Sequence, residues 1–220
     1  MVRRTRLEAQ ATRERLLDVA EGLILERGLA RTALQDIACA AGLTRGAIYW
    51  HFADKVALVQ AIIDRVDLPM EKALAEAAEA GSGAPWRGLR QMALAPFRLM
   101  QGDPRAARVL TILLHRAEFI GELAPLARRH HDAVDHFLQR AQGLFDAAAE
   151  SGQLDAATSP RCAATALLAL VDGLLRMATL ADDHRMAALA APAAVDALLA
   201  GLQAGPAGPG RREPGARPAG

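Results

Sequence analysis

Residues 32–55, TALQDIACAAGLTRGAIYWHFADK, carry the clearest structural signal in the chain. Thr32 and Gln35 have the spacing of a capping box, which predicts a helix beginning at Thr32. Gly42 adopts a positive φ at no steric cost, so it is predicted to form the turn that ends this helix. The apolar side chains recur at helical spacing, at Leu34, Ile37, Ala38 and Ala41.

A second short helix is predicted after the glycine turn, over residues 45–52. Thr44 is a favourable N-cap for it. Ile48 and Phe52 are four residues apart and are predicted to face the core. The residues left at the N-terminal tip and on the outer side are Thr44, Arg45, Gly46, Tyr49 and Trp50.

Two short helices joined by a tight turn are typical of a helix-turn-helix, whose second helix enters the DNA major groove with its N-terminus at the base edges. Arg45 is predicted to contact guanine, and the small Gly46 and Ala47 let the helix backbone approach the groove. Trp50 is predicted on the same side. Phosphate contacts are predicted for the backbone N–H groups of Thr32 and Ala33 and for the side chains of Tyr49, His51 and Lys55. The alternative is a purely structural motif whose aromatic side chains belong to the core.

The strings TALQDIACAAG (32–42) and LTRGAIYWHFADK (43–55) resemble the signature of the TetR family of bacterial transcriptional regulators, and within it the AcrR-like repressors of multidrug efflux operons. The resemblance is strongest over residues 10–60, and LTILLHRAEFIGEL (110–123) is similar to a ligand-domain helix of that subgroup. It implies a bacterial, cytoplasmic, nucleoid-associated homodimer. That homodimer would repress an efflux operon by binding a palindromic double-stranded DNA operator, and a hydrophobic small-molecule inducer would release it.

The composition predicts an all-α fold, because 52% of the 220 residues are apolar, only 4% are aromatic, and alanine and leucine dominate. We expect an N-terminal three-helix helix-turn-helix domain followed by a C-terminal helical ligand-binding and dimerisation domain. The last sixteen residues include nine Gly or Pro, which is typical of a disordered tail. The predicted divisions are a basic arm (1–11), the helix-turn-helix domain (12–55), the ligand-binding and dimerisation domain (56–203) and the tail (204–220).

The remaining helices are predicted from caps, prolines and apolar spacing. Pro69 is predicted to kink or break one of them, and Pro96 is predicted to kink another. The helix after Asp103–Pro104 is predicted to extend through Glu118 and Phe119. The other predicted spans are 12–27, 55–80, 86–101, 124–151, 160–180 and 192–203.

The net charge is only +1, but residues 1–60 hold nine Lys or Arg against seven Asp or Glu. The arginines of the first fifteen residues are predicted to add phosphate or minor-groove contacts, and the alternative is a solvated, disordered terminus. Cys39 and Cys162 lack metal-ligand spacing and are predicted to be reduced core thiols, with a redox disulfide as the alternative.

The chain has no secretory signal and no run of about 18 uninterrupted apolar residues, so no membrane span is expected. No cofactor, metal site or catalytic site is predicted, because the histidines show no HxxxH and no P-loop or GxSxG is present. An all-α enzyme therefore has no support.

Two segments, 163–180 and 187–202, are apolar around much of their circumference. They are predicted to pair with their copies in a four-helix homodimer interface, an arrangement that the family resemblance also implies. The alternative is burial in the core of a single chain. A two-fold dimer would present two recognition helices to a palindromic operator.

A ligand pocket is predicted between the proline-containing helices. Its candidate apolar walls are Leu68, Met70, Met92, Phe97, Met100, Leu113, Phe119 and Phe137, and its candidate polar anchors are His115, Glu118, Asp172 and Arg176. The resemblance implies that Glu118, in HRAEF, contacts cationic ligands. The alternatives are that Asp172 and Arg176 pair on the helix surface and that Glu118 faces water.

Two other functions are compatible with the sequence. One is a TetR-like regulator of a metabolic or other operon. The other is a helical small-molecule-binding protein without DNA function, against which the presence of Thr44, Arg45, Tyr49 and Lys55 argues.

Overall fold

The computed structural model describes residues 2–180 and 184–204, in which all the regular secondary structure is helical apart from one isolated bridge between Leu154 and Gln203. The all-α prediction is confirmed. A π-helical turn, η1 (Ile112–Arg116), and a 3₁₀ turn, η2 (Gly121–Leu123), lie between the sixth and seventh helices. The helices are α1 (Val2–Arg27), α2 (Leu34–Ala40), α3 (Arg45–His51), α4 (Lys55–Ala80), α5 (Pro85–Gly102), α6 (Pro104–Thr111), α7 (Ala124–Glu150), α8 (Pro160–Leu180) and α9 (His184–Leu202).

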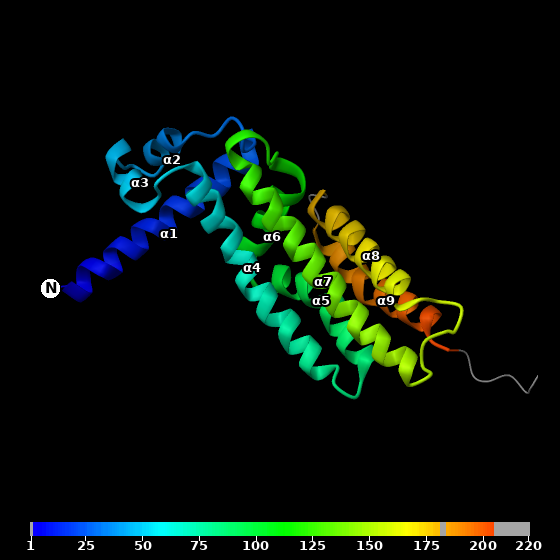
Figure 1. Cartoon of the computed structure of the whole chain (residues 1–220). Helices are drawn as coiled ribbons and strands as arrows, with labels where there is room; N and C mark the ends of the chain where they lie inside the picture. Colours follow the sequence, from blue (N-terminus) through cyan, green and yellow to red (C-terminus); the bar gives the residue numbers. More distant parts are fainter. Residues whose placement is uncertain (1, 181–183, 205–220) are drawn as a thin grey trace, which may run out of the picture.

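The molecule has two parts, as Figure 1 shows. Helices α2 and α3 lie against α1 at one end, and the N-terminal turns of α1 project past them. The remaining helices form an elongated bundle in which α4, α5 and α7 run together and α8 and α9 pair along one side. A helix-turn-helix unit on a larger helical domain is the architecture predicted from the sequence.

Two apolar cores follow this division, and α4 contributes to both. The first joins α1, α2 and α3 to the N-terminal half of α4, up to Val66, to α6 and η1, and to single buried residues near the ends of α5, α7 and α8, namely Met100, Leu126 and Ala178. The second begins at Leu74 of α4 and continues through α5, α7, α8 and α9. Pro69 lies on α4 between the two cores.

Helix α4 continues through Pro69, so of the predicted kink or break the break does not occur, and the kink stays a prediction. The helices α5 and α9 likewise continue through Pro96 and Pro192. Packing on both sides of each proline outweighs the loss of one backbone hydrogen bond. At the start of α4, Asp54 is the N-cap as expected, and its Oδ1 accepts from the backbone N–H of Ala57 at 2.7 Å.

The far end of α4 crosses the start of α5 at a glycine contact. A Cβ added to Gly88 would lie 2.7 Å from the Cα of Gly81, and one added to Gly81 would lie 2.7 Å from a Leu144 methyl carbon. No larger residue fits at either position without moving backbone or core. The turn between α4 and α5 therefore closes tightly.

Three helix boundaries differ from the prediction by more than two residues. Helix α1 begins at Val2 rather than Thr12, because residues 2–11 are mostly strong helix formers. Helix α9 begins at His184, before Pro192. Beyond α6 and η1 the chain is extended at Ala117, so Glu118 and Phe119 lie outside any helix. At the end of η1 the carbonyl of Arg116 accepts a hydrogen bond from the backbone N–H of Leu29 (3.1 Å), which links this turn to the segment after α1.

The two cysteines are free and exposed, so the prediction of core thiols is wrong. The predicted disordered tail falls on residues 205–220, outside the described part of the chain, apart from Ala204.

Candidate nucleic-acid interface and ligand domain

The tip of α3 is open to solvent. Thr44 caps the helix as predicted, since its Oγ1 accepts from the backbone N–H of Ala47 at 3.3 Å. Ile48 and Phe52 are 0% and 2% exposed and fasten α3 to the first core. The prediction that they face inward is confirmed, and α3 is held by its buried side while the opposite side remains free.

The outer side of α3 carries the predicted DNA-facing residues. Tyr49 is 45% exposed and Trp50 is 77% exposed, so neither belongs to the core. The guanidinium carbon of Arg45 lies 6.0 Å from the centre of the Tyr49 ring, which orients both side chains on one surface. At Gly46, an added Cβ would meet no atom within 4 Å. This surface therefore presents the guanidinium of Arg45 and the phenol of Tyr49, and at Gly46 the helix backbone is open to close approach by a partner.

A shallow groove of about 430 Å³ lies beside this surface, between the start of α2 and the junction of α3 with α4. It brings together four of the residues predicted to contact phosphate: Thr32, Ala33, Tyr49 and Lys55. Arg31 also lines the groove and was not singled out from the sequence, where it is an isolated cation in a loop. Its Nε donates to the carbonyl of Arg27 at the end of α1 (2.8 Å). The groove thus combines two basic side chains and a phenol, which suit an anion, with one carboxylate, that of the α4 N-cap Asp54.

Thr32 does not have the predicted role. It is 2% exposed, and its Oγ1 donates to the carbonyl of Gly28 (2.9 Å). The N-cap of α2 is Ala33, whose backbone N–H donates to Asp36 Oδ2 at 3.1 Å. The N–H of Thr32 donates to the carbonyl of Leu29 (3.3 Å), so neither predicted N–H group is free for phosphate. The turn after α1 is tight enough to draw Thr32 into the core.

His51 lies at the end of α3, partly buried between the DNA-facing surface and α1. Its ring is 5.1 Å from that of Trp50, edge to face. Burial, reinforced by the positive charge of Arg13, lowers the pKa of His51 below its ordinary value. The guanidinium of Arg13 lies over the Phe52 ring at 5.1 Å. Both effects favour the neutral form of the His51 ring in the free protein.

The predicted apolar ligand residues are divided between the two cores. Met92, Phe97 and Phe137 are buried in the second core, and Met70 packs against it. Met100, Leu113 and Phe119 belong to the first core or pack against it. Leu68 is 61% exposed, so it does not line an interior wall. The structure does not bring the eight residues to one site, and a pocket among them stays a prediction.

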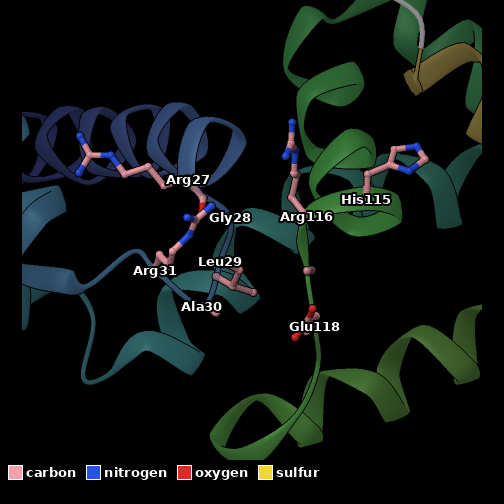
Figure 2. A pocket seen from close by; sticks show the side chains of 9 residues that line it. Arg27, Gly28, Leu29, Ala30, Arg31, His115, Arg116 and Glu118 are labelled. Atoms are coloured by element: carbon pink, nitrogen blue, oxygen red, sulfur yellow. The ribbon is translucent and has the colours of Figure 1, made fainter.

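The predicted polar anchors also lie apart from an apolar interior. Asp172 Oδ2 accepts a hydrogen bond from Arg176 Nε at 2.9 Å, and both side chains are about half exposed. This agrees with the alternative that the two residues pair on the surface of the helix. His115 Nε2 is 2.8 Å from Thr179 Oγ1 of α8. Figure 2 shows His115 and Glu118 beside a pocket of about 230 Å³ at the junction with the α1–α2 turn, where Arg27, Arg31 and Arg116 are the other charged residues. Glu118 is exposed, in agreement with the alternative that it faces water.

Among the described residues no three His, Cys, Asp or Glu side chains group as metal ligands. In the same part of the chain, α8 alone is long and apolar enough, by length and composition, to cross a membrane, and a third of that apolar window is buried in the chain. The core helix of a soluble protein meets the same criteria. Exposed apolar side chains on α8 and α9 include Met177, Leu180 and Leu189.

Comparison with known proteins identifies the two parts of the chain. Residues 16–62 match the family described as "Bacterial regulatory proteins, tetR family", and residues 84–204 match "MAATS-type transcriptional repressor, C-terminal region". The HTH-type transcriptional repressor BepR of Brucella suis biovar 1 (strain 1330) is 41% identical over 174 residues, covering 79% of this chain and 83% of BepR.

Three solved structures, of two proteins, are similar over nearly the whole chain. NalD, the secondary repressor of the MexAB-OprM multidrug efflux pump in Pseudomonas aeruginosa, has a TM-score of 0.77 and 34% identity over 89% of this chain and 98% of NalD. SmeT, the repressor of the Stenotrophomonas maltophilia pump SmeDEF, has a TM-score of 0.71 and 32% identity over 89% and 92%. A SmeT–triclosan complex has a TM-score of 0.71 and 28% identity over 93% and 100%. With its exposed α3 tip and both domains matched, the chain belongs to the TetR family of bacterial transcriptional regulators.

Proposed function

We propose that the chain is a cytoplasmic repressor that binds a palindromic operator as a homodimer and controls a multidrug efflux operon. A hydrophobic small molecule, bound in the α4–α9 domain, releases it. The observation that carries DNA binding is the exposed tip of α3 with the groove beside it. Arg45 and Tyr49 are exposed on α3, which buried Ile48 fastens to the core, and the partly exposed Lys55 at the start of α4 lines the groove. The efflux target is supported by similarity to BepR, NalD and SmeT.

The proposed homodimer accounts for the exposed apolar surface of α8 and α9. A single chain buries only a third of the apolar window of α8. Exposed apolar patches of this kind are a cost for a soluble monomer and are covered in oligomers. With α8 and α9 at the edge of the bundle, a second copy can pack there without disturbing α1–α3 (Figure 1).

A mobility-shift assay on the region upstream of the gene tests the proposal. A specific complex should form at moderate salt and should dissociate when triclosan, the compound in the SmeT complex, is added. Unrelated DNA of equal length is the control. Equal retention of both fragments would argue against a specific regulator, whereas specific binding insensitive to triclosan would point to a different inducer.

Replacing Lys55 by Gln is expected to weaken binding to specific and unrelated DNA by a similar factor, because a phosphate contact carries no sequence information. Each lost contact should lower the slope of log K against log [salt] by about 0.9, and a dimer loses two such contacts. Fluorescence anisotropy across a salt series measures this slope. A loss confined to the specific fragment, with an unchanged slope, would assign Lys55 to base recognition instead.

Operator affinity is expected to rise as the pH falls from about 7 toward about 6, the range in which histidine titrates. The pKa of His51 is lowered in the free protein by burial and by Arg13, and a phosphate beside the ring would raise it in the complex. The complex then binds more protons than the free protein, so acid favours binding. The His51→Gln variant should lose this component. If the His51→Gln variant and the unmodified chain show the same pH dependence of operator affinity, His51 does not contact phosphate.

A further inference from the structure

A buried carboxylate joins α1 to two helices of the larger domain. The side chain of Glu21, on α1, is 0% exposed. Its Oε1 accepts a short hydrogen bond from Arg65 of α4, and its Oε2 accepts from Arg108 Nε of α6 at 3.1 Å. A buried charge is strongly unfavourable unless it is paired with good geometry. The position of α1 is therefore tied to both α4 and α6.

The contact is a stripe rather than a single pair. Glu14, Asp18 and Glu21 lie at i, i+4 and i+7 on α1, so they share one face. Arg65 binds all three carboxylates, including Asp18 Oδ1 at 2.8 Å, and its side chain is only 12% exposed. Burial alone would lower the pKa of Arg65, but hydrogen bonds to Glu14, Glu21 and Asp18 raise it, so the guanidinium stays charged.

The opposite side of α4 carries a second ionic anchor at the same level. Arg129 of α7 lies 2.6 Å from Asp64 and 2.9 Å from Asp67. Both anchors precede Pro69, whose nitrogen cannot donate to the carbonyl of Arg65. The N-terminal half of α4 thus lies between α1 and α7, and the helix is weakest where the two apolar cores divide.

We propose that Glu21 is a positioning residue for operator binding, whose bonds to Arg65 and Arg108 hold α1, and the helix-turn-helix packed on it, in the orientation that the operator requires. Hydrogen-bonded ion pairs add a defined direction and distance to the apolar packing between these helices. A ligand that shifts α4 or α6 against α1 must strain these bonds. Its binding free energy must therefore favour the shifted arrangement by more than the cost of straining them. This inference rests on the proposed function.

The orientation can be measured without DNA or inducer. Native Cys39 on α2 and a cysteine at exposed Ser82, after α4, would carry spin labels in a Cys162→Ser background. Diluting the labelled chain with unlabelled cysteine-free chain keeps one labelled subunit in each dimer. Pulsed electron paramagnetic resonance should give one narrow distance distribution. We expect Glu21→Gln, which keeps the shape and removes the charge, to broaden or shift it.

Two further variants make the result decisive. Arg108→Met removes the α6 partner and keeps its aliphatic stem, and it serves if Glu21→Gln fails to fold. Asp196→Asn is the matched control, because Asp196 pairs with Arg90 (2.6 Å) between α9 and α5, away from α1. Circular dichroism melts set a measuring temperature below every transition. Unchanged distance distributions in folded Glu21→Gln and Arg108→Met would overturn the proposal, even if both were less stable.

Operator affinity supplies the functional readout. Both variants should weaken binding to the upstream fragment by about 5- to 150-fold, the usual range of coupling between sites, and the Asp196→Asn control should bind as the unmodified chain does. If the unmodified chain does not bind this fragment, the proposed function fails while the distance measurement still tests Glu21. Altered distances with unchanged operator affinity would overturn the positioning role.

Discussion

Replacing Arg45 and Tyr49 together by Ala is expected to abolish specific operator binding. Both side chains are exposed on the free side of α3, and the Arg45 guanidinium lies over the Tyr49 ring. A bidentate arginine–guanine contact contributes about 1–3 kcal/mol of discrimination. Two copies in a dimer then contribute about 2–6 kcal/mol, or roughly 30-fold to 10⁴-fold in affinity. Mobility-shift titrations of the upstream fragment measure the loss.

The matched control is Arg87→Ala, which removes an exposed cation from α5, at the far end of the bundle from α3. It should retain operator affinity, which separates a specific contact from a change in net charge. The double variant should also melt at the same temperature as the unmodified chain, because neither side chain is buried. Operator affinity unchanged by the double substitution would refute the roles given to Arg45 and Tyr49.

Placing Glu at Ala169 of α8 and Ala197 of α9 is expected to convert the proposed homodimer to a monomer. Both alanines are exposed in the single chain, so the substitutions leave its cores intact, and Glu is a good helix former. At a two-fold interface, however, four carboxylates would be brought together and desolvated. Loss of the dimer should remove specific binding, since each subunit supplies only one recognition helix.

Size-exclusion chromatography with light scattering measures the mass, and the same upstream fragment measures the binding. Ala75→Glu with Ala147→Glu is the control, because these alanines are exposed on α4 and α7, outside the proposed interface. A double variant at Ala169 and Ala197 that remains dimeric would place the interface elsewhere. A monomer that still binds the fragment specifically would contradict the requirement for two-fold symmetry.

The helix-turn-helix could be predicted from the sequence because its signals are local. Gly42, at φ 70°, forms the turn, Thr44 and Asp54 cap their helices, and Ile48 faces inward, each as predicted. These features depend on residues within one or two turns. Thr32 was assigned wrongly because its hydroxyl and N–H bond to Gly28 and Leu29, in a turn whose path the sequence pattern does not fix.

The interior of the larger domain was much less predictable. Apolar residues such as Met92 and Met100 are equally compatible with a core and with a pocket, and long-range packing places them in different cores. Glu21 was not singled out because its partners Arg65 and Arg108 are 44 and 87 residues away. Spacing along one helix reveals the acidic stripe, but not which helices cover it.

The glycine contact between Gly81 and Gly88 pins the far end of α4, and this gives the helix the mechanics of a lever. The segment before Pro69, residues 55–68, is about 21 Å long at 1.5 Å per residue, and it moves only if the ion pairs of Asp64, Arg65 and Asp67 rearrange. Swinging it by about 10° at Pro69 would carry Lys55 about 4 Å, and opposed motion in two subunits would change the span by up to about 8 Å. Successive major grooves on one face of DNA are about 34–36 Å apart. A swing of this size is therefore enough to prevent the two recognition helices of a dimer from entering successive grooves together.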